Sequence, residues 1–169
     1  MAVSHRFLAC LLSALPVVAA AAAERPKPAG LPVVMTLQPG TALERTARSL
    51  VAQDLAAARR VGDRPLLVLG SVRLGTASER PALFVQLQSP RQCGSSGCST
   101  SAFAWIKGRW TKVLDDASGR IVILPTKHGG MSDLAANAER FVWNGTAYAS
   151  TRPAPAVDLR PHAPRPRHH

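Results

Sequence analysis

Two cysteines, Cys93 and Cys98, are the residues whose type and spacing say most about the chemistry open to this chain. They enclose a short loop of small residues, Gly94-Ser95-Ser96-Gly97. A redox pair of the thioredoxin type has two intervening residues rather than four, and a zinc site needs further Cys or His at ligand spacing. The spacing therefore predicts a structural disulfide, with a metal site or free thiols as the alternatives.

A disulfide across so short a loop predicts a stiff and exposed turn. Such a turn suits a recognition surface, because a segment that is ordered beforehand loses little entropy on binding. The four residues Gly94, Ser95, Ser96 and Gly97 are therefore a candidate binding loop. The simpler interpretation is a pinned connection between two strands.

The sequence offers little material for a catalytic site. Nucleophilic hydrolysis needs a nucleophile, a base and an orienting group, and the available set is Ser95 or Ser96 with His128 and Asp133. None of these serines lies in a G-x-S-x-G motif. A carboxylate pair for glycoside hydrolysis could come from Asp115, Asp116, Asp133 and Glu139, but Asp115-Asp116 before Ala-Ser-Gly is typical of a turn. We predict no catalytic residues, no metal and no cofactor.

Aromatic residues gather in the second half of the chain and supply the other candidate binding groups. They are Trp105, Trp110, Trp143 and Tyr148. Packing in a core is the ordinary role of such residues, whereas a few exposed aromatics can dominate an interface. Alternation along a strand does not show whether these side chains lie on the buried face or on the exposed face of the sheet.

The first structural element predicted along the chain is an amphipathic helix. Thr41 and Glu44 have the spacing of a capping box, and apolar residues then recur at helical intervals as far as Ala58. Gly62 is a suitable stop. The pattern predicts one helix over about residues 43–60.

After the helix the apolar period changes to two, which predicts short strands. The predicted strands are 66–72, 82–88, 100–106, 109–114, 120–124, 133–137, 141–143 and 146–148, with hairpin turns at Lys107-Gly108 and Asn144-Gly145. The gaps are too short for crossover helices, so the strands should be antiparallel. The predicted fold is α+β, with one N-terminal amphipathic helix packed on an antiparallel meander sheet of about six to eight short strands.

Residues 1–23 have the three parts of a secretory signal peptide. His5-Arg6 provides the basic start, an apolar run follows, and three alanines precede Glu24. The apolar run is about 16 residues, shorter than the roughly 20 needed to span a bilayer. We expect cleavage near Ala23 and Glu24, removal of Cys10, and a periplasmic or secreted mature protein in which two cysteines remain to pair.

The mature sequence divides into a central domain and two atypical ends. Residues 24–40 read as a Pro-rich linker, residues 41–150 as a single domain, and residues 151–169 as a basic tail rich in Pro, Arg and His that is expected to be disordered. Positive charge is spread over these parts, and the full chain has a net charge of +11. No aromatic and basic strip typical of nucleic-acid binding is present, so anionic envelope polymers or lipid head groups are the expected electrostatic partners.

The loop from Cys93 to Cys98, Gly130-Met131 with Asp133-Leu134, and Trp143-Asn144-Gly145 with Tyr148 resemble the C-terminal half of small, uncharacterised exported bacterial proteins. The resemblance covers about residues 81–148. It implies a compact exported domain with a disulfide and a terminal aromatic hairpin, and it implies no activity.

We therefore expect a non-catalytic binding module whose partner is a protein or an anionic polymer of the cell envelope. The alternatives are an inhibitor of a cell-wall hydrolase of the lysozyme type, acting through the disulfide loop, and a weak hydrolase that depends on His128. Like-charge repulsion disfavours the inhibitor, because lysozymes are usually basic.

Overall fold

The structure is a computed structural model that describes residues 30–151. The predicted signal peptide, residues 24–29 of the predicted linker and the basic tail from residue 152 onward lie outside these described residues. Within residues 30–151, no helix combines the length and the apolar character needed to cross a membrane.

Two short helices occupy the region where one helix was predicted. Helix α1 spans Ala42–Leu50 and helix α2 spans Ala52–Arg60. Thr41 caps α1 as expected, because its Oγ1 accepts a hydrogen bond of 3.1 Å from the backbone N–H of Glu44. Val51 separates the helices with φ −108° and ψ 25°, and it is buried between β-sheet and helices. The chain bends at this buried, β-branched residue, a feature that helical periodicity alone does not reveal.

The strands form two antiparallel sheets rather than the single meander that was predicted. The first sheet has the order β2-β3-β4-β6, with β5 and β7 both paired to β6; the second has the order β1-β8-β9-β10-β11. The strands are β1 (Leu31–Pro32), β2 (Thr36–Leu37), β3 (Leu66–Val72), β4 (Ala82–Gln88), β5 (Cys93–Gly94), β6 (Gly97–Ile106), β7 (Arg109–Ser118), β8 (Ile121–His128), β9 (Met131–Ala136), β10 (Glu139–Trp143) and β11 (Tyr148–Ser150).

The chain leaves the first sheet and enters the second at the turn between β7 and β8. Gly119 has φ +91°, and its hydrogen atoms face the side chain of Asn137, which a Cβ would approach to 2.3 Å. This turn leads the chain from the first sheet into the second. Alternation of apolar residues predicts which side chains are buried, but two sheets and one sheet produce the same alternation.

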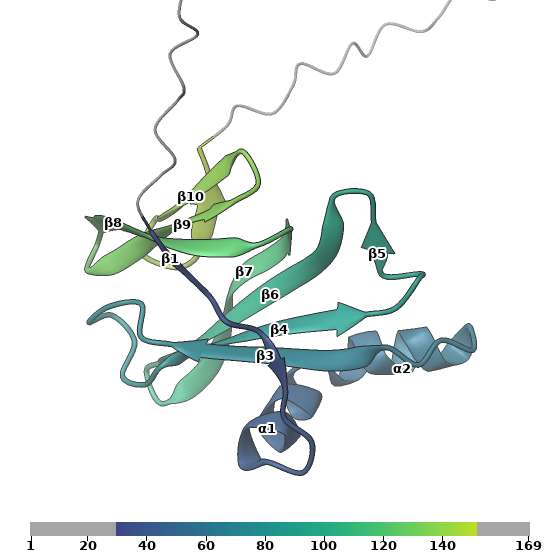
Figure 1. The fold of residues 1–169 in the computed structure, drawn as a ribbon. Coiled ribbons are helices and arrows are strands. Elements are labelled where there is room, and N and C mark those ends of the chain that lie inside the picture. The colour runs from purple at the N-terminus through teal and green to yellow at the C-terminus, as the bar shows by residue number, and fades with distance from the viewer. Residues whose placement is uncertain (1–29, 152–169) are drawn as a thin grey trace, which may run out of the picture.

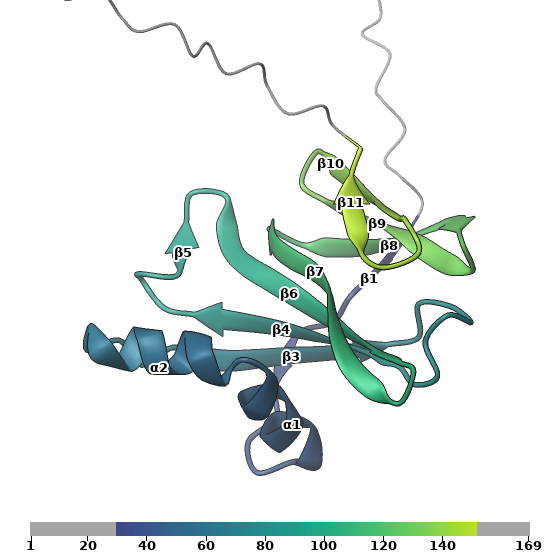
Figure 2. The same ribbon diagram turned by 180° about the vertical axis from the view of Figure 1, so that it is seen from behind.

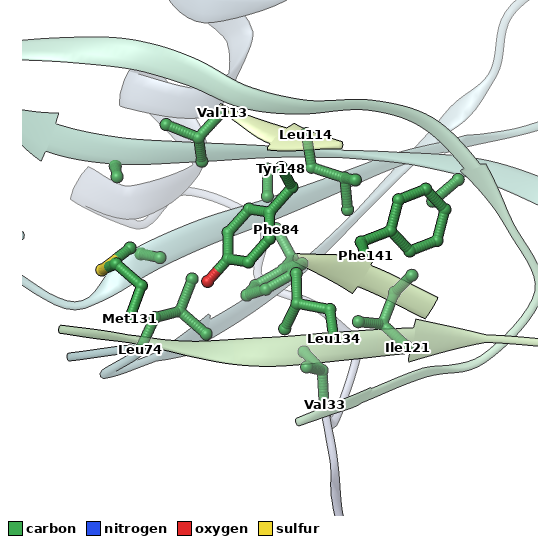
Figure 3. Close-up of a cluster of buried hydrophobic side chains, with 14 of the residues drawn as sticks. Val33, Leu74, Phe84, Val113, Leu114, Ile121, Met131, Leu134, Phe141 and Tyr148 are labelled. Carbon is green, nitrogen blue, oxygen red and sulfur yellow. The ribbon is translucent and has the colours of Figure 1, made fainter. Parts of the chain in front are cut away.

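Two hydrophobic clusters hold the layers together. One lies between the two sheets and includes Phe84, Ile121 and Leu134, as Figure 3 shows. The other lies between the helices and the first sheet and includes Val51, Leu83 and Phe103. The first sheet is therefore covered on both faces, by the helices on one side and by the second sheet on the other (Figures 1 and 2).

Both predicted hairpins are present, with one difference in turn length. Lys107 and Gly108 form the two-residue turn between β6 and β7, and both have positive φ. The second hairpin pairs Trp143 with Tyr148, so its turn contains four residues rather than Asn144-Gly145 alone. The side-chain oxygen of Asn144 accepts hydrogen bonds from the backbone of Thr146 and Ala147, which stabilises the longer turn.

Part of the predicted linker belongs to the folded domain. Residues 31–37 pass from the edge of the second sheet, where β1 pairs with β8, to the edge of the first sheet, where β2 pairs with β3 (Figure 1). Val33 is buried in the cluster between the sheets. The high proline content of residues 24–40 concealed these two edge strands, since proline is tolerated on edges.

Candidate functional site

The predicted disulfide between Cys93 and Cys98 is confirmed. It joins directly paired residues of β5 and β6, with an S–S distance of 2.04 Å and a Cα–Cα distance of 4.0 Å. Gly94 also pairs with Gly97, so Ser95 and Ser96 form a two-residue turn at the tip. All four loop residues are exposed, whereas the cysteines are partly buried.

Two residues from outside the loop contact its base through hydrogen bonds. Gln86 on β4 donates from its side-chain amide to the carbonyl of Cys98, at 3.1 Å, and to the hydroxyl of Thr100. Asn137, in the turn after β9, donates to the carbonyl of Ser118 at 2.9 Å, and its amide nitrogen also lies 3.5 Å from the carbonyl oxygen of Ser96. The hairpin is thus fastened to both sheets. Sequence reasoning missed Gln86, Asn137 and Gly119, because their partners lie far away along the chain.

The inner side of the hairpin borders a cavity of about 290 Å³. Its lining combines the loop base with residues of both sheets: Val33, Met35, Gln86, Gly97, Cys98, Thr100, Gly119, Arg120 and Ile121. The exposed side chain in this set is Arg120, a cation. The surroundings of the loop are therefore mixed apolar and polar, with one positive charge at the rim.

The structure separates the four candidate aromatics into two pairs. Trp143 and Tyr148 are 5% and 8% exposed, pack edge to face with ring centroids 5.5 Å apart, and belong to the core between the sheets. Trp105 and Trp110 are cross-strand partners where β6 ends and β7 begins, and both are only partly buried. Only the second pair can meet a ligand without rearrangement of the core.

A buried charged cluster on the second sheet unites two residues of the predicted triad. The Oδ1 of Asp133 lies 2.7 Å from the Nδ1 of His128, and its Oδ2 accepts hydrogen bonds from Thr126 and Arg140. Burial by itself raises the pKa of the Asp133 carboxyl. The hydrogen bonds from Arg140, Thr126 and His128 outweigh that effect, so the pKa lies below its usual range.

The predicted nucleophiles do not join this cluster. Ser96 contacts Asn137 at one end of β9, whereas His128 pairs with Met131 at the other end. Six residues of strand separate these ends, which corresponds to about 20 Å. His128 can act as a base through its Nε2, but Ser95 and Ser96 do not lie within its reach. Among residues 30–151, no group of three His, Cys, Asp or Glu side chains could hold a metal ion.

The carboxylates considered for glycoside hydrolysis occupy different surroundings. Asp115 and Asp116 are exposed on β7, and Asp115 forms an ion pair of 3.0 Å with Lys112. Asp116 has φ +57°, as expected for an Asp in an irregular position of a strand. Asp133, by contrast, is fully buried beneath its three hydrogen-bond donors. The structure thus assigns structural partners to Asp115 and Asp133.

Comparisons with known proteins provide no further guide to this site. No family model, no curated protein and no solved structure matches the chain.

Proposed function

We propose that this chain is an exported protein that binds a macromolecule of the cell envelope without transforming it, and that the disulfide hairpin from Cys93 to Cys98 is its recognition element. The observation that carries the proposal is the exposure of all four loop residues on a hairpin that is closed by a disulfide. Disulfides persist in oxidising compartments such as the periplasm and the cell exterior. This location agrees with the leader-like segment at residues 1–23.

The physical advantage of the hairpin is that its shape exists before binding. The disulfide and the hydrogen bonds from Gln86 and Asn137 restrict the loop in the free protein. Binding of a partner therefore involves a smaller loss of conformational entropy than binding to a flexible Gly/Ser segment would. The small side chains of Ser95 and Ser96 leave backbone and hydroxyl groups available for hydrogen bonds in a narrow partner site.

The proposal predicts a clear difference between two variants in affinity capture from envelope extract. The bait is oxidised protein of residues 24–169, and the test variant is Ser95→Arg, which places a bulky charge on the loop tip. Gln53→Arg is the matched control, because Gln53 is exposed on α2 and the charge change is the same. A specific partner should be enriched by the unmodified bait and by Gln53→Arg but not by Ser95→Arg, and the purified partner should reproduce this order of affinity.

Equal capture by the two variants would contradict a role for the loop. A bait that ends at Ser150 separates recognition by the domain from attraction to the basic tail. If only the longer bait recovers material, and salt releases it, the interaction is electrostatic and the loop proposal fails. A panel of muramidases at micromolar protein tests the inhibitor alternative, and activity lost in His128→Ala would be the sign of a hydrolase.

A further inference from the structure

The turn between β6 and β7 presents two tryptophans at the end of the first sheet that lies away from the disulfide hairpin. The ring centroids of Trp105 and Trp110 are 5.4 Å apart, and the rings are nearly perpendicular at 82°. Trp105 lies eight residues beyond Gly97 on β6, a separation of about 25 Å along the strand. In both ribbon views the β5 hairpin and this turn lie at opposite ends (Figures 1 and 2).

A cation is fixed against this aromatic pair. The guanidinium carbon of Arg80 lies 4.1 Å from the ring centroid of Trp105, within the range of a cation–π interaction. Two hydrogen bonds to backbone carbonyls position Arg80: the N–H of Glu79 donates to the carbonyl of Trp105, and the side-chain hydroxyl of Ser78 donates to the carbonyl of Arg80 at 2.7 Å. Arg80 is therefore held beside the indole while its side chain remains exposed.

Two further cations surround the same turn. Lys107 and Arg109 flank Gly108 and are exposed. Arg109 pairs with Ile106 and so lies on the opposite face of β7 from Trp110, whereas Lys107 lies in the turn itself. The ion pairs found among residues 30–151 involve Arg48, Lys112, His128 and Arg140, and thus none of the three cations at this turn. Glu79 is the carboxylate adjacent to Arg80 in the chain, and it lines a hollow together with Arg73 and Lys127. The turn is consequently a local concentration of positive charge around two partly exposed indoles.

From this arrangement we infer that Arg80, Trp105, Trp110 and Lys107 form a binding site for an anionic polysaccharide. A guanidinium recognises a carboxylate or phosphate through paired hydrogen bonds, and an indole provides a flat apolar surface for the C–H groups of a sugar ring. A chain of charged sugars repeats both features along its length. It therefore complements the alternation of cation and aromatic ring at this turn.

The surroundings favour a polymer over a protein partner. Protein interfaces have an apolar core that is excluded from water. The large apolar side chains exposed within residues 30–151 are Leu31, Val34, Leu37, Val61 and Leu66, and none of them belongs to this turn. A shallow site with several cations suits a ligand that makes many repeated contacts.

This site goes beyond the proposed role of the disulfide hairpin and is independent of it. Ser95→Arg changes the hairpin alone, and substitutions at Arg80 or Trp105 change the turn alone. Either proposal can therefore fail while the other stands.

The test measures binding of the full mature chain to three polymers at 0.15 M salt by tryptophan fluorescence and ultracentrifugation. Polygalacturonate is the anionic polysaccharide, polyglutamate carries the same carboxylates on a polypeptide, and dextran is an uncharged polysaccharide. We expect the tightest binding to polygalacturonate. Arg80→Gln should weaken that binding about five- to tenfold, because one charge-assisted contact with a carboxylate of the polymer is lost.

Arg91→Gln is the matched control, since Arg91 is an exposed arginine near the disulfide hairpin and the charge change is identical. Trp105→Phe provides a second test variant, which should also weaken binding to polygalacturonate, and circular dichroism reports whether its fold is intact. Equal losses in Arg80→Gln and Arg91→Gln would overturn the proposal in favour of general charge attraction. Binding to polyglutamate as tight as to polygalacturonate, or no binding to any polymer, would also overturn it.

Discussion

The Nδ1 of His128 lies 2.7 Å from the Oδ1 of Asp133, yet the side chain of His128 is 50% exposed and that of Asp133 is 0% exposed. The carboxylate is thus buried beneath donors that reach it from the protein surface. Arg140 on β10 and Thr126 on β8 bind its other oxygen. Asp133 therefore links three neighbouring strands of the second sheet.

Asp133→Asn should lower the free energy of unfolding by about 2–3 kcal/mol, because it removes the charge from hydrogen bonds with Arg140 and His128 while keeping the side chain's size. Urea unfolding followed by circular dichroism measures this change. Asp54→Asn, at an exposed position of α2, should stay within about 0.5 kcal/mol of the unmodified protein. Similar losses in both variants would show that the buried cluster contributes no more to the free energy of unfolding than an exposed carboxylate does.

The contribution of Asp133 should disappear in acid. Hydrogen bonds from Arg140, Thr126 and His128 hold the pKa of its carboxyl below the usual range in the folded protein, despite burial. The stabilisation is therefore fully present above the unfolded-state pKa of about 4 and is lost as pH falls through the lower folded-state value. Urea unfolding at pH 5, 4 and 3 should show the unmodified protein and Asp133→Asn converging. Parallel profiles would contradict this assignment.

Tyr148 should resist ionisation as long as the protein is folded. Burial raises the pKa of its phenol, the negative charge of Asp133 adds to the rise, and the hydroxyl donates to the carbonyl of Ser132 at 2.7 Å. It is the chain's single tyrosine, so absorbance at phenolate wavelengths reports on it alone. At pH 10 the folded protein should show almost no phenolate, whereas protein unfolded in urea should be about half ionised. Identical titrations would place the phenol in water.

Gly75→Ala should destabilise the folded domain, although it adds only one methyl group. A Cβ at Gly75 would lie 1.9 Å from the carbonyl oxygen of Gly130, where the loop after β3 meets the hairpin of β8 and β9. We expect a loss of about 1–3 kcal/mol in the free energy of unfolding, since backbone must move. Gly94→Ala is the matched control, because nothing lies within 4 Å of its added Cβ. A thermal shift shared by both variants would refute the close approach.

The double substitution Cys93→Ser and Cys98→Ser should cost about 2 kcal/mol in the free energy of unfolding, because so short a closed loop restricts the unfolded chain only modestly. Urea unfolding with and without reductant measures the effect, and reductant should leave the double variant unchanged. The folded domain should survive, since two hydrophobic clusters hold it independently of the disulfide. Complete unfolding of the variant would contradict this view.

Several elements could be predicted from local sequence alone. Strands β3 and β4 have the predicted bounds, because alternation of apolar residues ends at clear turn signals on both sides. The Lys107-Gly108 turn and the disulfide followed from short-range spacing. In each case the interacting residues are close in the sequence, so a local pattern contains the necessary information.

Local sequence patterns predicted the antiparallel strands, the helical region and the pairing of Cys93 with Cys98. Contacts between distant parts of the chain were needed to show that the strands form two sheets, that Trp143 is buried while Trp105 is partly exposed, and that Asn137 lies against the loop at Ser96. Periodicity shows that a strand or helix has an apolar face to bury, but the residues that bury this face come from a distant part of the chain. Several arrangements of the layers are compatible with the same local pattern, and packing between the layers stabilises one of them.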